Sequence, residues 1–492
     1  MPPPPSKPPQ PCPHKTLQLT PSPFAPLAGY TQPSSPECLA AQHYTPSSTA
    51  ARSRNKRKRD PTAQPPQKPQ SKIEIDKEPT TFPAPLVLPY DQLNYDPDEE
   101  PQSLTEWVEG EHRNVVTKER NVVYVVGYPE IGEELKGIGM NEWAKPQVAG
   151  TNKGEEGKEE VEQPDIEEIV EYLQAFYHGL RVQRLDTQLT YLPWTTNARG
   201  KKTPSRTKPK TSSSSSSSTT PHTVPKYISL HHPRTKTSTR IRVRPSPSIP
   251  PSPPFPVQLN LNDLLDGLLA ILPSDAYAIL LLVKQDIYES PEDDFCCGRA
   301  YGGSRIAVVQ TARYHPSLHP SGNEHVWPMS HCKAFVNAIC EGEEKGLGSK
   351  PASKKEMEMS RDEGGGVRRA ISAAMAGGDG GQEDKRALWT SRVAQTASHE
   401  LGHCFGMAHC VYFACNMMGT AGMEEDFRCP PYFCPVCQVK LGYAVGEGTL
   451  DQREYEKRRL EGLRGFCKGN GREKALMWRA LGGWVDARLE SL

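Results

Sequence analysis

"SHELGHCFGMAHCVYFACNMMG", residues 398–419, contains three histidines, three cysteines and one glutamate. Side chains of these types bind transition metals and transfer protons. Two of the possible ligands, His409 and Cys410, are neighbours in the chain. The donors of this stretch therefore serve either one metal ion or two ions with different roles, and the fold has to bring them together.

The first donors lie on a predicted helix. Residues 387–408, "ALWTSRVAQTASHELGHCFGMA", are expected to be helical to about Phe405. His399 and His403 are four positions apart, so both imidazoles leave one face of the helix and can bind a single zinc ion. Glu400 lies on a neighbouring face, where a carboxylate can take a proton from zinc-bound water without binding the metal itself.

Gly406 follows at the point where the chain must reverse. Glycine adopts a positive φ without steric cost, and the reversal would return His409 as a third nitrogen ligand. Three protein ligands leave a fourth position for water, which is the arrangement of a catalytic zinc. The alternative is an ordinary helix whose histidines bind no metal.

The cysteines predict a second site. Neighbouring side chains of an extended turn diverge, so Cys410 is expected to point away from the ion that His409 binds. Cys415 follows five positions later, and Cys434 and Cys437 form "CPVC". Four thiolates at such spacings make a closed, structural zinc site, which would fix the loop that carries His409. The alternatives are thiol packing without a metal and a redox C-x-x-C pair.

Other sulfur atoms lie close by in the sequence. Cys404 is about 100° round the helix from His403 and is predicted to be a core residue, whereas Cys429 could replace one of the thiolate ligands. Met417 or Met418 is expected to form the hydrophobic floor beneath the three-histidine zinc.

The composition of the whole chain limits its class. It has 492 residues with 49 prolines and an apolar fraction of 35%, so much of its length is not core. Lys+Arg and Asp+Glu balance at 59 each, and overall charge indicates no class of partner. Without a signal-peptide core or a membrane-length apolar run, we expect an intracellular protein of the cytoplasm, the nucleus or both. Its 13 cysteines would then be thiols or metal ligands rather than disulfides.

Composition also divides the chain into regions. Residues 1–83 are Pro-rich and aperiodic and are predicted to be disordered. Their basic run at 52–59 resembles a nuclear import signal, or is a solvated charge patch. The predicted folded domain is 84–446, with low-complexity insertions at about 195–256 and 343–385. A charged helical tail is predicted after it, at 447–492.

The folded region alternates between helices and strands. Residues 165–180 have helical spacing, 276–283 form a continuous apolar strand, and 121–129 is a further strand. This alternation indicates an α/β (α+β) fold with helices packed on a sheet. "SRIAVVQTA", 304–312, is the candidate for an exposed sheet edge that an extended peptide could join.

The motifs around the donors resemble the signature of the archaemetzincin family of zinc peptidases. That signature joins the long metzincin helix motif to H-C-x4-C-x-M and a later C-x-x-C, and this chain has "HELGHCFGMAHC", "VYFA", "CNM" and "CPVC". Sixteen residues, 418–433, separate Met417 from Cys434, one fewer than the family usually has. "LPSDAYAILLLVKQDIY" and "RVAQTASHELGH" are also similar to the family's core strand and active-site helix.

The resemblance implies a metzincin-type zincin catalytic domain with a mixed sheet and packed helices. It implies metal-dependent hydrolysis of peptides, with aminopeptidase-like action on short peptides suggested for some relatives. It also implies two Zn²⁺ ions per chain and Glu400 as the general base. The implied ligands of the catalytic zinc are His399, His403 and His409, and those of the structural zinc are Cys410, Cys415, Cys434 and Cys437.

Two functions from different classes compete for these residues. A zinc metallopeptidase would act on peptide or protein substrates, and we expect a monomer without a membrane partner. A non-catalytic, zinc-stabilised interaction module would act through the basic disordered segments, which could also contact nucleic acid. The presence of Glu400 favours the peptidase, because a structural site has no use for a base. Another hydrolase, such as a deacylase, is a third interpretation.

Overall fold

The computed structural model describes part of the chain. The described residues are 14–46, 80–95, 99–111, 113–147, 161–194, 224–247, 253–319, 325–343, 365–376, 384–446 and 448–492. Among them, no helix has both the length and the apolar character that crossing a membrane requires. The basic run at 52–59 lies outside the described residues, so its role in nuclear import stays a prediction.

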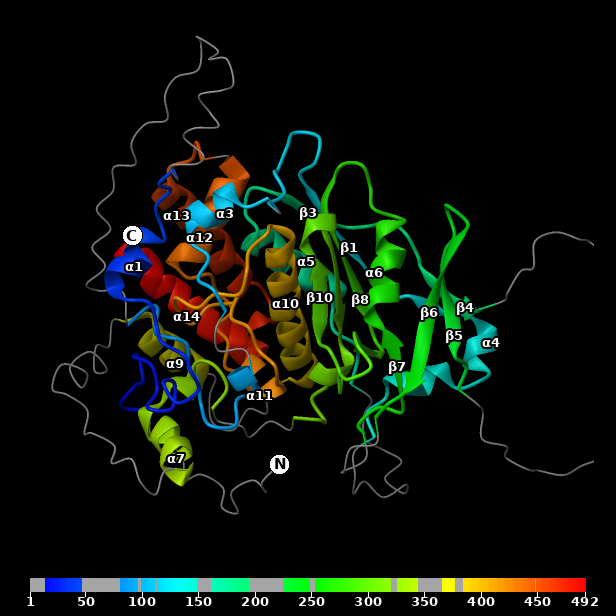
Figure 1. Cartoon of the computed structure of the whole chain (residues 1–492), viewed down its shortest axis with the longest axis horizontal. Helices are drawn as coiled ribbons and strands as arrows, with labels where there is room; N and C mark the ends of the chain where they lie inside the picture. The colour runs from blue at the N-terminus through cyan, green and yellow to red at the C-terminus, as the bar shows by residue number, and fades with distance from the viewer. Residues whose placement is uncertain are drawn as a thin grey trace, which may run out of the picture.

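A five-stranded sheet lies at the centre of the molecule (Figure 1). Its strands are β1 Val122–Val126, β3 Arg181–Arg184, β8 Ala276–Val283, β10 Gly298–Tyr301 and β11 Ile306–Gln310. In the order β10-β11-β8-β1-β3, the last four strands run parallel and β10 pairs antiparallel to β11. Every residue of β8 is buried, as expected for a parallel strand covered on both faces.

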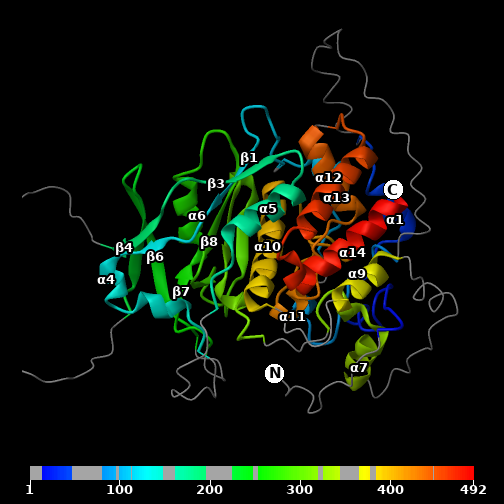
Figure 2. The same cartoon turned by 180° about the vertical axis from the view of Figure 1, so that it is seen from behind.

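Helices cover both faces of this sheet (Figures 1 and 2). Helices α10 (Lys385–Cys404) and α5 (Ile166–Phe176) pack on one face, and α6 (Leu261–Leu269) lies on the other. Trp389 and Leu401 of α10 belong to the core on the first face. The predicted α/β fold, a mixed sheet with packed helices, is confirmed.

Further helices form a layer beyond α10 (Figure 2). They are α9 Gly366–Met375, α12 Pro435–Gly446, α13 Gln452–Cys467 and α14 Leu476–Ser491. The predicted helical tail therefore contributes to the core, because Trp478 and Trp484 of α14 are buried. Helix α9 lies within the predicted insertion at 343–385 and packs against α14.

A second, six-stranded sheet was not predicted. Its strands are β2 Glu130–Ile131, β4 Thr190–Pro193, β5 Tyr227–His232, β6 Thr237–Pro245, β7 Val257–Asn260 and β9 Asp286–Tyr288, in the order β2-β4-β5-β6-β7-β9. Strands β5 and β6 form a hairpin inside 195–256, a range that was predicted to be a low-complexity insertion. The basic composition concealed its period of two, in which Ile241 and Val243 are buried and Arg242 between them is exposed.

The described N-terminal residues 14–46 are folded against the rest of the chain, unlike the disorder predicted for 1–83. Their helix is α1 Ser35–Ala40. The Tyr30 hydroxyl donates a hydrogen bond to the Val411 carbonyl oxygen at 2.7 Å. The proposed division into three regions otherwise stays a prediction. The remaining α-helices of the described residues are α3 Leu104–Glu109, α4 Glu133–Lys136, α7 Lys333–Glu343 and α11 Met423–Asp426.

Candidate active site and thiol centre

Two histidines lie on the last turns of α10. Their Nε2 atoms, in His399 and His403, are 3.1 Å apart. Nδ1 of His399 donates to the Asn416 carbonyl oxygen at 2.7 Å, and Nδ1 of His403 donates to the Met407 carbonyl oxygen at 2.8 Å. Because a carbonyl oxygen only accepts, each Nδ1 carries the proton and each Nε2 keeps a lone pair for a metal.

The third histidine reaches the same point through a tight turn. Helix α10 ends at Cys404, and Gly406 has a φ of +78°, the left-handed conformation that the sequence predicted there. One ring nitrogen from each of His399, His403 and His409 lies within 4.8 Å of the other two. The structure therefore brings the three predicted zinc ligands together.

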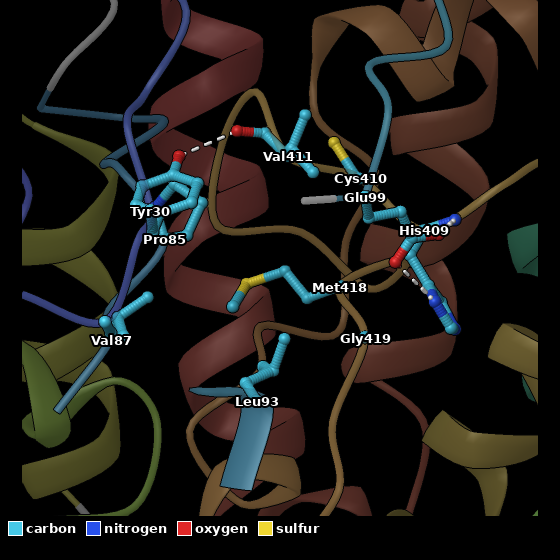
Figure 3. Close-up of a pocket in the computed structure, with 11 residues that line it drawn as sticks. Tyr30, Pro85, Val87, Leu93, Glu99, His409, Cys410, Val411, Met418 and Gly419 are labelled. Atoms are coloured by element: carbon cyan, nitrogen blue, oxygen red, sulfur yellow. Dashed lines mark hydrogen bonds and ion pairs between the residues drawn. The ribbon is translucent and has the colours of Figure 1, made fainter. Parts of the chain in front are cut away.

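Glu99 holds the third histidine in place, and sequence reasoning missed it. Its carboxylate accepts a hydrogen bond from Nδ1 of His409 at 2.9 Å and another from the backbone N–H of the same residue at 3.2 Å. Figure 3 shows the Glu99 carboxylate next to the His409 ring. A carboxylate on the outer nitrogen fixes the imidazole tautomer and makes the inner nitrogen a stronger ligand.

Glu400 faces a cleft beside the histidines. Its side chain is 7% exposed, and it lines a cavity of about 720 Å³ together with all three histidines. Burial raises the pKa of Glu400 to about 8, whereas Arg299 acts in the opposite direction. Burial also lowers the pKa of His399 to about 4, so this imidazole is neutral at neutral pH. A raised proton affinity suits a carboxylate that accepts a proton, and neutral imidazoles suit metal ligands.

Strand β10 forms one wall of the cleft. A Cβ at Gly298 would lie 2.9 Å from Oε1 of Glu400, so glycine at this position leaves room for the carboxylate. The opposite wall includes Thr420 and Asp426. Glu400 thus lies between an edge strand and the chain that follows the third histidine.

The prediction that 304–312 forms the sheet edge is wrong. β11 lies between β10 and β8, so both of its backbone edges are paired. The free edge next to the cleft belongs to β10, whose sequence "GRAY" is short and partly exposed. Strand β10 has neither the apolar alternation nor the length that typically predicts a strand. The more apolar segment 304–312, which contains β11, was therefore predicted as the sheet edge instead.

Met417, rather than Met418, packs against the helix of the histidines. A Cβ at Gly402 of α10 would lie 2.3 Å from Sδ of Met417, and Met417 is fully buried. Met418 instead lines a small apolar pocket behind His409, together with Tyr30 (Figure 3). Of the two candidates, Met417 and Met418, it is therefore Met417 that packs against the helix, where Gly402 leaves room for its sulfur atom.

The four predicted thiol ligands form a separate group. One sulfur atom from each of Cys410, Cys415, Cys434 and Cys437 lies within 4.8 Å of the others, and all four residues are buried. Sγ of Cys410 is 3.5 Å from Sγ of Cys434. Hydrogen bonds from the other three thiols lower the pKa of Cys410 well below its usual value, which favours the thiolate that binds metals. The group joins the loop after His409 to the start of α12.

The remaining cysteines near these groups are in neither of them. Cys404 is fully buried, as predicted for a core residue. Cys429 donates a hydrogen bond to the Glu425 carbonyl oxygen at 3.6 Å, and it is absent from both groups of possible ligands. Eleven cysteines of the described residues are free thiols. Cys332 is disulfide-bonded, so the prediction that the cysteines are thiols or metal ligands is wrong for this residue.

The fold and the first donor group define the class of the domain. A helix carries H-E-x-x-H, a glycine turn returns a third histidine, and a methionine packs beneath them, as in metzincin-type zincins. Comparison with known proteins agrees, since residues 379–442 match Peptidase family M54. The matched residues contain both donor groups, and the match agrees with the archaemetzincin resemblance of the sequence motifs.

Individual relatives show how far the similarity extends. Archaemetzincin-2 of Pongo abelii is 26% identical over 196 residues, which are 40% of this chain and 44% of that protein. Archaemetzincin-2 of Homo sapiens is 43% identical over 61 residues, or 12% of this chain and 17% of that protein. The chain thus spans less than half the length of these relatives. A crystal structure of archaemetzincin from Methanopyrus kandleri aligns with 68% of this chain and 99% of its own. The two are 15% identical, with a TM-score of 0.29.

Proposed function

We propose that this chain is a zinc metallopeptidase that hydrolyses peptide bonds, with an aminopeptidase-like activity on short peptides. The observation that supports this best is the arrangement of Glu400 in an open cleft beside three converging histidines. The match of residues 379–442 to Peptidase family M54 supports the same reaction class.

The donor set fits a zinc ion. In His399, His403 and His409 the Nδ1 atoms bind acceptors of the protein, so the Nε2 atoms are the ones left to bind the metal. Three nitrogen ligands and a free fourth position are typical of catalytic zinc. When bound, the ion supplies Lewis-acid polarisation of a carbonyl oxygen and acidifies water.

Glu400 moves the proton in the proposed reaction. Its carboxylate takes a proton from the attacking water and later delivers that proton to the leaving amine. Gly298 leaves the space in which the carboxylate can do this without displacing β10. Burial strengthens the proton affinity of the carboxylate.

The thiol group supports a proposal of a second, structural zinc, and hence of two ions per chain. Four thiols leave no coordination position for water. Bound metal would fix Cys410, and with it His409, to Cys434 and Cys437 at the start of α12. The non-catalytic alternative accounts for this group but for neither Glu400 nor its cleft.

Metal content and activity test the proposal together. We expect two equivalents of zinc in the purified full chain, falling to one in the double variant Cys434→Ser plus Cys437→Ser. Removal of all zinc with a chelator should abolish the hydrolysis of a library of short peptides, and added zinc should restore it. One equivalent in the wild type, or hydrolysis that survives complete metal removal, would contradict the proposal.

A further inference from the structure

The cleft continues along α10 beyond the histidines. Thr396 lies one helical turn before Glu400 and lines the same cleft as Tyr314, Cys297 and Asp426. Thr396 lies on α10 and Tyr314 follows β11. Cys297 precedes β10, and Asp426 is the last residue of α11. We call Thr396, Tyr314, Cys297 and Asp426 the Asp426 subsite.

Hydrogen bonds join the walls of the Asp426 subsite. Oγ1 of Thr396 is 2.6 Å from the Tyr314 hydroxyl oxygen. The Tyr314 hydroxyl is in turn hydrogen-bonded to the Asp426 carboxylate, and this bond lowers the pKa of the carboxyl. A carboxylate oriented in this way is a fixed acceptor rather than a freely rotating surface group.

Asp426 has no ion pair of its own within the described residues. Cations around the cleft are committed to other carboxylates: Arg299 pairs with Glu289, and Arg313 pairs with Asp286. Arg392 faces Asp426 from α10, and its guanidinium stacks over the Phe427 ring at 4.0 Å.

The electrostatics of the subsite favour a cation. Burial raises the pKa of Asp426 to about 6, and the neighbouring Glu425 acts in the same direction. A partly buried carboxylate without a paired cation is stabilised when a positive charge enters beside it. Glu289 and Glu400 line the same cleft, and their negative charge draws cations toward it.

We propose that Asp426 binds a cationic group of the peptide substrate, the ammonium or guanidinium of a residue next to the scissile bond. This inference rests on the proposed peptidase function and adds a substrate class to it. Asp426 lines the same cleft as Glu400, so a cation bound there would belong to the same peptide. Both a lysine or arginine side chain and a free peptide N-terminus carry the required charge.

Matched peptides test this assignment. Each peptide of the set has lysine or norleucine beside the scissile bond, and each exists with a free and with an acetylated N-terminus. Hydrolysis is measured as kcat/KM for the zinc-loaded full chain, wild type and Asp426→Asn. Glu424→Gln, an exposed carboxylate on the same short helix, is the matched control, and Asp426→Glu tests rescue by a retained charge.

We expect the wild type to prefer the cationic peptides by about tenfold, the value of one charge-assisted hydrogen bond. This preference for cationic peptides should disappear in Asp426→Asn and persist in Glu424→Gln and Asp426→Glu. Loss of the lysine preference identifies the side chain as the source of the cation, and loss of the preference for a free N-terminus identifies the peptide terminus. An equal preference in wild type and Asp426→Asn would overturn the proposal.

A binding arm separates this proposal from the proposed function. If the wild type hydrolyses none of the peptides, the peptidase function fails, and the dissociation constants of the same peptides are measured instead. Tighter binding of cationic peptides that disappears in Asp426→Asn would still support the subsite. Equal binding of lysine and norleucine peptides, with either N-terminus, would refute it. Thermal unfolding of each variant, alone and with a bound peptide, shows whether the chain is folded.

Discussion

Oε2 of Glu99 lies 2.9 Å from Nδ1 of His409, although 310 positions separate the two residues in the chain. This hydrogen bond gives the third histidine an anionic partner, whereas the other two histidines have backbone carbonyl partners. His409 follows a turn instead of standing on α10, so its orientation depends more on such a contact. We therefore infer that Glu99 positions His409 in the candidate metal site.

Neutralising Glu99 should weaken the metal site. We expect Glu99→Gln to reduce zinc affinity about tenfold to a hundredfold, because the partner of a ligating imidazole controls its orientation and basicity. Competition with a chelator of known affinity measures the change. Glu100→Gln, at the exposed neighbouring residue, is the control and should bind zinc like the wild type. Equal affinities for all three proteins would show that the contact with His409 is incidental.

The close packing of Met417 against Gly402 of α10 predicts that a larger residue at position 402 destabilises the protein. Gly402→Ala would place a Cβ 2.3 Å from Sδ of Met417, and overpacking of this kind lowers the free energy of unfolding by about 1–3 kcal/mol. Urea unfolding measures the loss. Gly465→Ala is a matched helical control, because nothing lies within 4 Å of a Cβ added there, and it should stabilise the protein by about 1 kcal/mol. A stable Gly402→Ala protein would mean that Met417 does not pack as described.

The two donor groups should differ in their effect on stability. Cys410→Ala removes a ligand of a closed site, and we expect it to lower the unfolding temperature of the zinc-loaded protein far more than His399→Ala does. The reason is that metal binding by a structural site contributes directly to folding free energy, on the order of several kcal/mol. Thermal unfolding with saturating zinc makes the comparison. Similar losses for both variants would refute the structural role of the thiol group.

The free edge of β10 gives a prediction about peptide binding. The Gln310 N–H donates to the Cys297 carbonyl oxygen at 3.0 Å, so Cys297 faces β11, and by alternation Ala300 turns its backbone groups outward. Ala300→Pro removes that outward N–H and should weaken peptide binding about two- to tenfold. Ala300→Ser, which keeps the N–H, should bind normally. Isothermal titration of a short peptide measures both, and unchanged binding by the proline variant would place the peptide elsewhere.

The local features of the site could be predicted from the sequence because short-range chemistry determines them. The spacing of His399 and His403 fixes their common helix face, and Gly406 marks the turn that returns His409. The same reasoning separated Cys410 from the histidines. Each of these inferences needed only residues within a few positions of one another.

Long-range contacts could not be predicted in this way. Glu99 reaches His409 from a distant segment, and Asp426 joins Glu400 in one cleft only through the tertiary fold. The edge strand was misassigned because the apolar 304–312 gives a stronger strand signal than the short β10. The hairpin of β5 and β6 was missed because its basic side chains conceal the buried positions between them.

We propose that Glu400 is the base that activates water beside a zinc ion bound by three histidines. Turnover of a short-peptide library by zinc-loaded wild type and by zinc-loaded Glu400→Gln, at equal zinc content, tests this role. We expect the variant to lose about a hundredfold to ten-thousandfold in turnover while keeping its zinc. Equal turnover by the two proteins would show that Glu400 is not the base.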